Sequence, residues 1–316
     1  MKREFIYPVI SAFVLILTLA GASAASNESK ASVRNTPKIG GYVQFRGMYQ
    51  EDKPSSFRVK RVRLKFTGEL TERVKYKVQV DAALERILKD TRLSFIFSPK
   101  LSIIVGQFLV PFSYEGNISS SATDLVDRSL IVKKLAPFRD VGFYLTGNIR
   151  NLYYGAGFFN GTGGNAIDDN DFKDFISRIV IQPVNGLHTG VSYLYGKRKS
   201  DDQTTEFSKS LFGAELQFSY RELSIKSEYI FSKDQVDAYG LYLLLNYKIL
   251  EHLHLVARYE LWEPDTAIAD NTQNIITFGT NYFLFDVTKL QLNYLLTHEE
   301  GKGIKNQLIG QIQIKF

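Results

Sequence analysis

Basic side chains gather in one short region of this 316-residue sequence. Residues 58–92 contain eleven Lys and Arg residues against five acidic residues, and the segment RVKRVRLKF (58–66) alone holds five basic residues. Stripes of Lys and Arg attract anions, and the planar guanidinium of Arg matches the geometry of oxyanions. A nuclear-localisation or nucleic-acid-binding segment is the other chemistry that this composition suggests.

The basic cluster follows a two-residue period, as in a β-strand. Val62, Leu64 and Phe66 alternate with basic residues, and the segment after residue 73 repeats this pattern. In a strand that crosses a membrane, a charged side chain facing lipid costs about 2–4 kcal/mol at the bilayer midplane. If these segments are such strands, their basic face must line a water-filled lumen. Pairing with lumen carboxylates such as Asp81 and Asp90 is the alternative interpretation. The predicted anion-pathway lining is Arg46, Arg61, Arg63, Lys65, Lys75, Lys77 and Arg92.

Two basic residues of the same segment do not fit this alternation. Arg58 and Lys60 share the lipid-facing parity of Val62 and Leu64. We expect them to lie at the external rim of the barrel, where that parity is tolerated.

The N-terminus has the pattern of an export signal. A positive start, an apolar run over residues 9–20 and the small residues Ala22-Ser23-Ala24 predict a cleaved signal peptide at 1–24. A membrane anchor is the alternative, but the apolar run is short of the about 20 residues that a spanning helix needs. Residues 25–37 are predicted to be a flexible leader and 38–316 a single domain. The sequence has no Cys, which excludes disulfides and thiolate metal sites.

Period-two alternation continues along the rest of the chain. It predicts an all-β fold, a transmembrane antiparallel β-barrel whose strands have about the 9 to 11 residues needed to cross a bilayer. Tight turns alternate with longer connections, as expected for short periplasmic turns and longer external loops. Closure removes the unpaired edges that hydrocarbon cannot accommodate. The sixteen predicted strands lie at about 38–50, 57–69, 72–82, 88–98, 100–110, 139–149, 151–160, 172–182, 186–197, 207–220, 222–232, 236–248, 251–262, 273–284, 286–297 and 304–316.

The longest connection, 111–138, follows the fifth predicted strand. We predict that it folds into the pore, with a solvated surface loop as the alternative. Helical spacing in TDLVDRSLIVKK (123–134) predicts a short helix that Thr123 would cap. The candidates for a constriction in this loop are Tyr114, Glu115, Asp127 and Arg128.

Four stretches carry a family resemblance: RVKRVRLKFTGEL (58–70), VGQFLVPFSYE (105–115), RDVGFYLTG (139–147) and YYGAGFFNGTGGN (153–165). Together they resemble the phosphate-selective porin O/P family over most of 38–316. The resemblance implies a sixteen-stranded, homotrimeric channel in the outer membrane of a Gram-negative bacterium, with a basic lumen that favours anions. The last strand, QIQIKF (311–316), resembles the segment by which barrel-assembly machinery recognises outer-membrane proteins, which makes Phe316 the candidate assembly signal.

These observations predict a porin for passive diffusion of small solutes, with a preference for small anions such as phosphate or other oxyanions. A non-selective or sugar-type channel and a structural barrel without transport are the alternatives. Ser, His and acidic residues are too dispersed for a catalytic triad, so we expect no enzyme, no cofactor and no metal. DDNDFKD (168–174) lacks the spacing of a calcium loop. The expected partners are small anions, membrane lipid and lipopolysaccharide, and not nucleic acid.

Overall fold

The structure is a computed structural model that describes residues 36–51, 53–199, 205–301 and 303–316. The predicted signal peptide and most of the predicted leader lie outside these residues. The strands are β1 (Lys38–Gln50), β2 (Lys53–Thr71), β3 (Val74–Asp81), β4 (Leu88–Ser98), β5 (Leu101–Leu109), β6 (Arg139–Ile149), β7 (Leu152–Phe159), β8 (Asp174–Val184), β9 (Leu187–Lys199), β10 (Glu206–Tyr220), β11 (Leu223–Lys233), β12 (Ala238–Leu250), β13 (Leu253–Glu263), β14 (Gln273–Leu284), β15 (Thr288–Glu299) and β16 (Gly303–Lys315).

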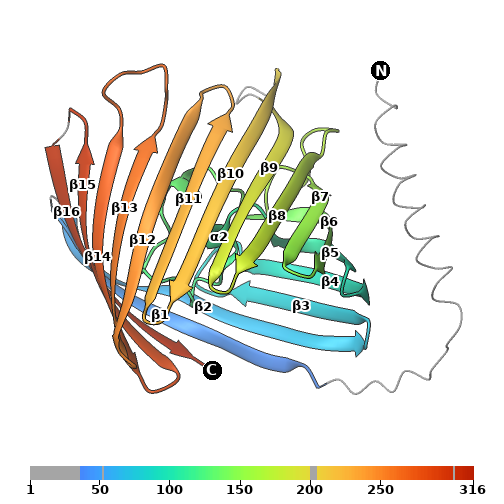
Figure 1. Cartoon of the computed structure of the whole chain (residues 1–316), viewed down its shortest axis with the longest axis horizontal. Coiled ribbons are helices and arrows are strands. Elements are labelled where there is room, and N and C mark those ends of the chain that lie inside the picture. The colour runs from blue at the N-terminus through green and yellow to red at the C-terminus, as the bar shows by residue number, and fades with distance from the viewer. Residues whose placement is uncertain (1–35, 52, 200–204, 302) are drawn as a thin grey trace, which may run out of the picture.

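These strands form one closed barrel. Each pairs antiparallel with its neighbours in sequence, and β1 pairs with β16 to complete the ring (Figure 1). The predicted sixteen-stranded antiparallel barrel is therefore confirmed. The strand bounds differ most at β2, which begins at Lys53 rather than 57. Its first four residues are exposed on both faces, so the sequence has no alternation there to mark the strand.

The two ends of the barrel differ in their connections. At one end, hairpins close through two or three residues, and Arg150, Arg221 and Phe285 adopt φ values of 52°, 51° and 56° in these turns. Positive φ is the conformation that tight hairpin turns use. We call this end the short-turn end and the opposite end the long-loop end. The barrel's first strand begins, and its last strand finishes, at the short-turn end.

The faces of the strands have the polarity of a membrane barrel. On β12, Leu243 and Leu245 point outward and are 44% and 41% exposed, whereas Tyr242 and Leu244 point inward and are almost fully buried. An apolar outer surface suits contact with lipid. No helix in the described part of the chain is long and apolar enough to cross a membrane.

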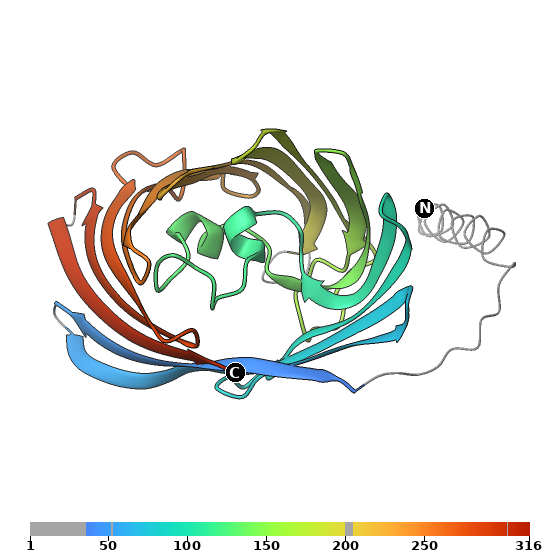
Figure 2. The same cartoon turned by 60° about the horizontal axis from the view of Figure 1, so that its bottom comes forward.

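The connection between β5 and β6, residues 110–138, lies inside the barrel and is called the internal loop below (Figure 2). It contains two short helices, α2 (Tyr114–Asn117) and α3 (Leu130–Lys134). The prediction of one helix over 123–134 is wrong in extent, because Ser129 caps a helix that begins only at Leu130. The hydroxyl of Thr123 instead donates to the carbonyl oxygen of Ser120.

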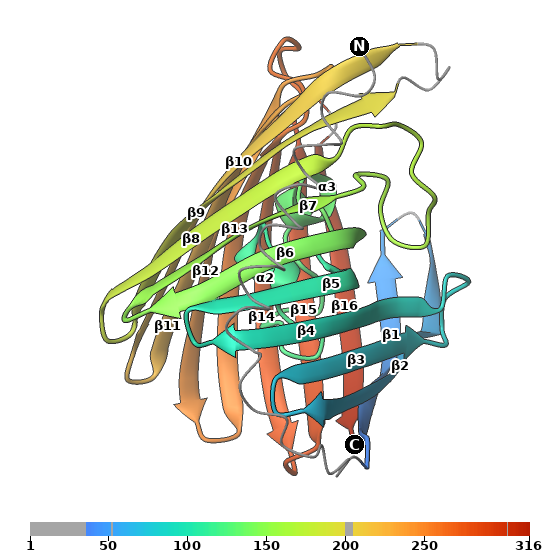
Figure 3. The same ribbon diagram turned by 90° about the vertical axis from the view of Figure 1, so that its right-hand side faces the viewer.

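Two glycines of the barrel wall leave room for side chains of the internal loop to pack against it. A Cβ atom at Gly240 would collide with the Ile131 side chain, and one at Gly279 would collide with Leu125. Both loop side chains are buried, and both glycines belong to strands on the side of the barrel opposite β3–β5 (Figure 3). The loop is thus packed against one wall and leaves the other wall open.

Candidate anion pathway

A cavity of about 400 Å³ lies between the internal loop and the open wall. Its charged lining consists of eight cationic side chains and one carboxylate, that of Asp127. We call it the basic chamber. The cations come from β2, from the β3–β4 connection, from β4, from the internal loop and from the start of β6: Lys60, Arg61, Arg63, Arg86, Lys89, Arg128, Lys133 and Arg139.

A β-bulge at Lys60 brings part of this charge inward. Arg61 pairs with Gln44, but the next pair is Val59 with Phe45, so Lys60 is an extra residue in β2. A bulge reverses the alternation on one side of it. Arg58 consequently pairs with the inward-facing Arg46 instead of following the lipid-facing parity.

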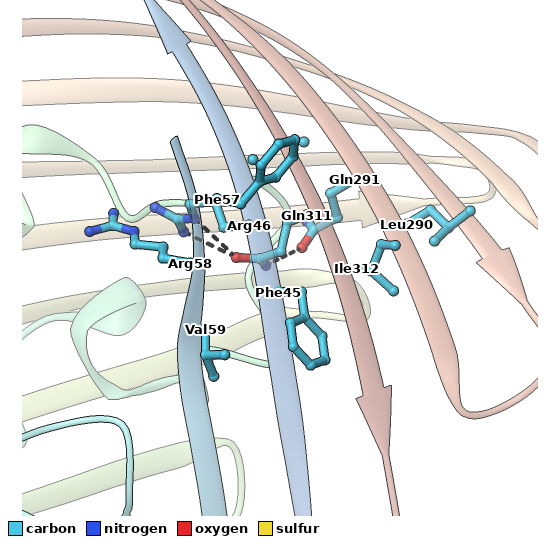
Figure 4. Close-up of a pocket in the computed structure, with 11 residues that line it drawn as sticks. Phe45, Arg46, Phe57, Arg58, Val59, Leu290, Gln291, Gln311 and Ile312 are labelled. Carbon is cyan, nitrogen blue, oxygen red and sulfur yellow. Dashed lines mark hydrogen bonds between the residues drawn. The ribbon is translucent and has the colours of Figure 1, made fainter. Parts of the chain in front are cut away.

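The two sides of this wall are visible in Figure 4, which shows an apolar groove on the outer surface. Phe45 and Val59 lie on the outer side and are 50% and 48% exposed. Arg46 and Arg58 extend to the other side of the same strands. The expectation that Arg58 and Lys60 retain the lipid-facing parity at the rim is therefore wrong, because the bulge had no signature in the alternation.

Most cations of the basic chamber have no carboxylate partner. Arg63 pairs with Asp81 at 3.0 Å and Arg139 with Asp90 at 2.6 Å. Arg128 donates only to the main-chain oxygens of the internal loop and to a serine hydroxyl. Among the described residues, none of the other five makes an ion pair: Lys60, Arg61, Arg86, Lys89 and Lys133. The chamber therefore keeps a net positive field that pairing does not cancel.

Two ion pairs, one partly buried and one fully buried, hold the internal loop in place. Arg46 pairs with Asp127 at 3.0 Å and also donates to the Val126 carbonyl oxygen. On β13, Arg258 pairs with Glu115 at 3.2 Å. Breaking a buried pair by removing one partner typically costs about 3–5 kcal/mol, so the Arg258–Glu115 contact in particular should keep the loop from moving freely.

The internal loop also joins its two helices to the wall through carboxylates. Glu228 of β11 accepts hydrogen bonds from the main-chain N–H groups of Tyr114 and Glu115, and Glu260 of β13 accepts one from Leu130. These N–H groups belong to the first turns of α2 and α3, which have no acceptor within the helix.

The predicted lining residues separate into different environments. Arg61 and Arg63 line the basic chamber as predicted in position. Arg46 is only 2% exposed, so it fixes the internal loop rather than facing a passage, which corrects the prediction for this residue. Lys75 is exposed and pairs with Glu69 at 2.7 Å, and Lys65 is exposed without an ion pair among the described residues.

Lys77 and Arg92 are the remaining predicted lining residues, and neighbouring groups partly offset their positive charges. Lys77 pairs with the buried carboxylate of Asp90. The guanidinium of Arg92 lies 5.9 Å from the centre of the Phe108 ring. The alternative of structural pairing therefore applies to Lys77 but not to Arg61.

The constriction candidates also divide into two groups. Asp127 and Arg128 border the basic chamber. Glu115 is 5% exposed and lies between the loop and the wall, so it cannot narrow the passage directly, which corrects that prediction. The Tyr114 ring lies 5.8 Å from the Lys226 ammonium, outside the chamber lining.

The packing of the internal loop shifts the pKa values of its ionisable side chains. Burial by itself would raise the pKa of Asp127, but the neighbouring cations, Arg46 first and then Lys133 and Lys60, together hold the pKa below its ordinary value. Burial lowers the pKa of Arg128 and raises that of Glu115. Asp127 therefore stays ionised at neutral pH as the single negative group in the chamber.

Sequence reasoning missed several members of the chamber. Arg86 and Lys89 belong to the same basic region, 58–92, but do not extend its alternation, because Arg86 lies in the β3–β4 connection and Lys89 at the start of β4. Lys133 and Arg139 follow the buried part of the internal loop, and only the folding of that loop brings them across the lumen.

Comparison with protein-family models decides the family. The model described as "Phosphate-selective porin O and P" matches residues 39–247, about two thirds of the chain. The chain belongs to this family. It is an outer-membrane porin, and the sixteen-stranded barrel agrees with that assignment.

Solved structures show the same fold at low sequence identity. An anion-selective porin from Comamonas acidovorans has a TM-score of 0.71 at 13% identity, covering 89% of this chain and 99% of that one. OmpF of Salmonella typhi gives 0.70 at 11%, covering 89% and 98%. The trimer form of Vibrio cholerae OmpT gives 0.68 at 12%, covering 89% and 99%. Comparison with curated protein sequences gave no significant match.

Proposed function

We propose that this porin conducts small solutes by passive diffusion and favours small anions, with the basic chamber as the selective part of its lumen. The observation that carries the proposal is the lining of that chamber, in which eight cations face a single carboxylate. Low-dielectric walls focus such a field and raise the local concentration of anions. The family name and the anion selectivity of the Comamonas porin agree with an anionic solute.

Oxyanions such as phosphate are the proposed preferred solutes within this class. Arg61 is held by a hydrogen bond of 2.8 Å to Gln44, which leaves most of its guanidinium donors for a ligand. The flexible ammonium groups of Lys60 and Lys89 supply further charge nearby. A pore must also release its ligand, so a series of moderate contacts suits transport better than one tight site.

The reversal potential of the purified porin in a KCl gradient tests the anion preference. We expect a reversal potential whose sign shows that chloride permeates better than potassium. We also expect added phosphate to reduce the chloride current. A potential of the opposite sign would refute the proposal, and a value near zero would favour the non-selective or sugar-type channel. Absence of any conductance would instead support a structural barrel without transport.

We also propose that the porin assembles as a homotrimer and acts without catalysis. The trimer form of OmpT, which has the same fold, supports the first proposal, and the channel family supports the second. Light scattering in a mild detergent, corrected for bound detergent, measures the mass of the assembly. A monomeric mass at concentrations where the barrel remains folded would contradict the trimer.

Phe316 is the proposed signal for the barrel-assembly machinery. It closes the seam between β16 and β1, where its main chain exchanges two hydrogen bonds with Gly41. Its side chain is 61% exposed on the folded barrel. Phe316→Ala should lower the amount of porin in the outer membrane while leaving refolding from urea into detergent intact. Equal losses in both assays would indicate a structural role alone.

A further inference from the structure

A second cavity lies behind the segment that borders the basic chamber. It has a volume of about 270 Å³ and is enclosed by the end of the internal loop, by the 161–163 segment and by the inner faces of β8–β10 toward the long-loop end. Phe138 and Arg139 contribute to both cavities and separate them. We call this cavity the side pocket.

One wall of the side pocket is apolar and closely packed. Ile176, Leu194 and Leu211, from three neighbouring strands, are each 1% exposed and belong to the main apolar cluster inside the barrel. A wall of this kind takes up the hydrocarbon part of a small solute. It does not suit a fully hydrated inorganic ion.

The charged groups of the side pocket are mostly compensated by one another. Arg198 makes a two-pronged pair with Asp174, at 2.7 and 2.6 Å, and Lys209 pairs with Asp234 at 3.1 Å. The guanidinium of Arg139 is occupied by Asp90 on the chamber side. These cations are therefore not free to attract an anion into the side pocket.

Three polar side chains of the side pocket lack a partner among the described residues: two have no ion pair and one has no hydrogen bond. Asp140 is 4% exposed, and its carboxylate accepts hydrogen bonds from the Val141 and Gly161 N–H groups, yet no described cation lies within ion-pair distance. The buried hydroxyl oxygen of Thr162 has no hydrogen-bond partner in the described part of the chain. Lys134 is exposed at the edge and makes no ion pair with any described residue. Buried carboxylates are normally paired, so this arrangement suits a ligand that carries its own cation.

We propose that the side pocket binds a small zwitterion with an apolar side chain, namely an apolar α-amino acid. Its ammonium group would bond to Asp140 and the Thr162 hydroxyl, its hydrocarbon side chain would contact the Ile176–Leu194–Leu211 wall, and its carboxylate would meet Lys134. The side pocket would hold such solutes at the long-loop end, apart from the anions in the basic chamber. This inference does not depend on the anion preference of the porin.

The test measures binding to the purified full-length porin in detergent by isothermal titration calorimetry. L-Leucine, isoamylamine and 4-methylpentanoate share one hydrocarbon part but carry both charges, only the ammonium and only the carboxylate, respectively. We expect L-leucine to bind at millimolar concentration, isoamylamine to bind more weakly and 4-methylpentanoate to bind weakest. Equal binding of 4-methylpentanoate and L-leucine, or no binding of L-leucine, would overturn the proposal.

Two variants locate the site. Asp140→Asn should weaken L-leucine binding by about tenfold or more, the usual effect of losing a charge-assisted hydrogen bond, whereas Asp286→Asn in an exposed turn should not. Lys134→Gln, which alters an exposed side chain and should fold normally, is expected to reduce L-leucine binding to the level of isoamylamine. Unchanged binding in Lys134→Gln would remove the proposed carboxylate contact and overturn the zwitterion assignment, even if Asp140→Asn does not fold.

Discussion

Replacing Arg61 with Gln removes one unpaired charge from the basic chamber while keeping a side chain that can hydrogen-bond to Gln44. A cavity of 400 Å³ has a radius of about 4.6 Å if treated as a sphere, so an ion near its centre lies roughly 6 Å from a wall charge. At about 6 Å in water, one charge contributes about 0.7 kcal/mol. Screening at about 0.1 M salt reduces this to about 0.4 kcal/mol.

That energy predicts a measurable change in ion selectivity. About 0.4 kcal/mol lowers the chloride population roughly twofold and raises that of potassium equally, so the ratio of their permeabilities should fall about fourfold. In about 1 M salt the Debye length is only about 3 Å, and the same ratio should change by less than about 1.5-fold. The dependence on salt distinguishes an electrostatic effect from a change of pore shape.

Reversal potentials of single channels in planar bilayers give these ratios. Lys100→Gln is the matched control, because it removes one cation from an exposed turn at the short-turn end. A permeability ratio that is unchanged in Arg61→Gln would refute the assignment of selectivity to the basic chamber. So would an equal change in Lys100→Gln, since it would show that only the net charge of the protein matters.

Three further perturbations test the packing of the internal loop against the wall and the ion pairs that hold it there. Gly240→Ala should destabilise the barrel by about 1–3 kcal/mol in urea unfolding, because the new methyl group collides with the loop, whereas Gly310→Ala meets no atom within 4 Å and should have little effect. Arg258→Gln leaves two buried glutamates without their cation and should cost about 3–5 kcal/mol and add flicker to the single-channel current; a quiet channel of wild-type stability would contradict this. The pKa of Asp127 is depressed, so its pair with Arg46 stabilises the fold above about pH 4 and is lost as pH falls further. Thermal unfolding of Asp127→Asn should accordingly lose less stability than the wild type between about pH 5 and 2.5, and parallel curves would exclude that pair as the cause.

Local periodicity was enough to predict the barrel, its strand number and the polarity of its faces. These properties follow from local geometry, because successive side chains of a strand point to opposite faces and lipid tolerates only one kind of face. On β12 the outward Leu243 and Leu245 alternate with the inward Tyr242 and Leu244, as a period of two requires. The same alternation places Arg61 and Arg63 on the inner face, where both line the basic chamber.

Which charges remain unpaired depends on contacts that form only in the folded barrel. Arg46 and Arg61 have the same side-chain type and both point inward, yet Asp127, 81 residues beyond Arg46, occupies one and leaves the other available. The bulge at Lys60 reversed the parity of Arg58 without changing the amino-acid pattern. Pairing across the lumen depends on where the internal loop packs, and that packing depends on distant glycines in the opposite wall. A periodicity within one strand carries no information about such contacts.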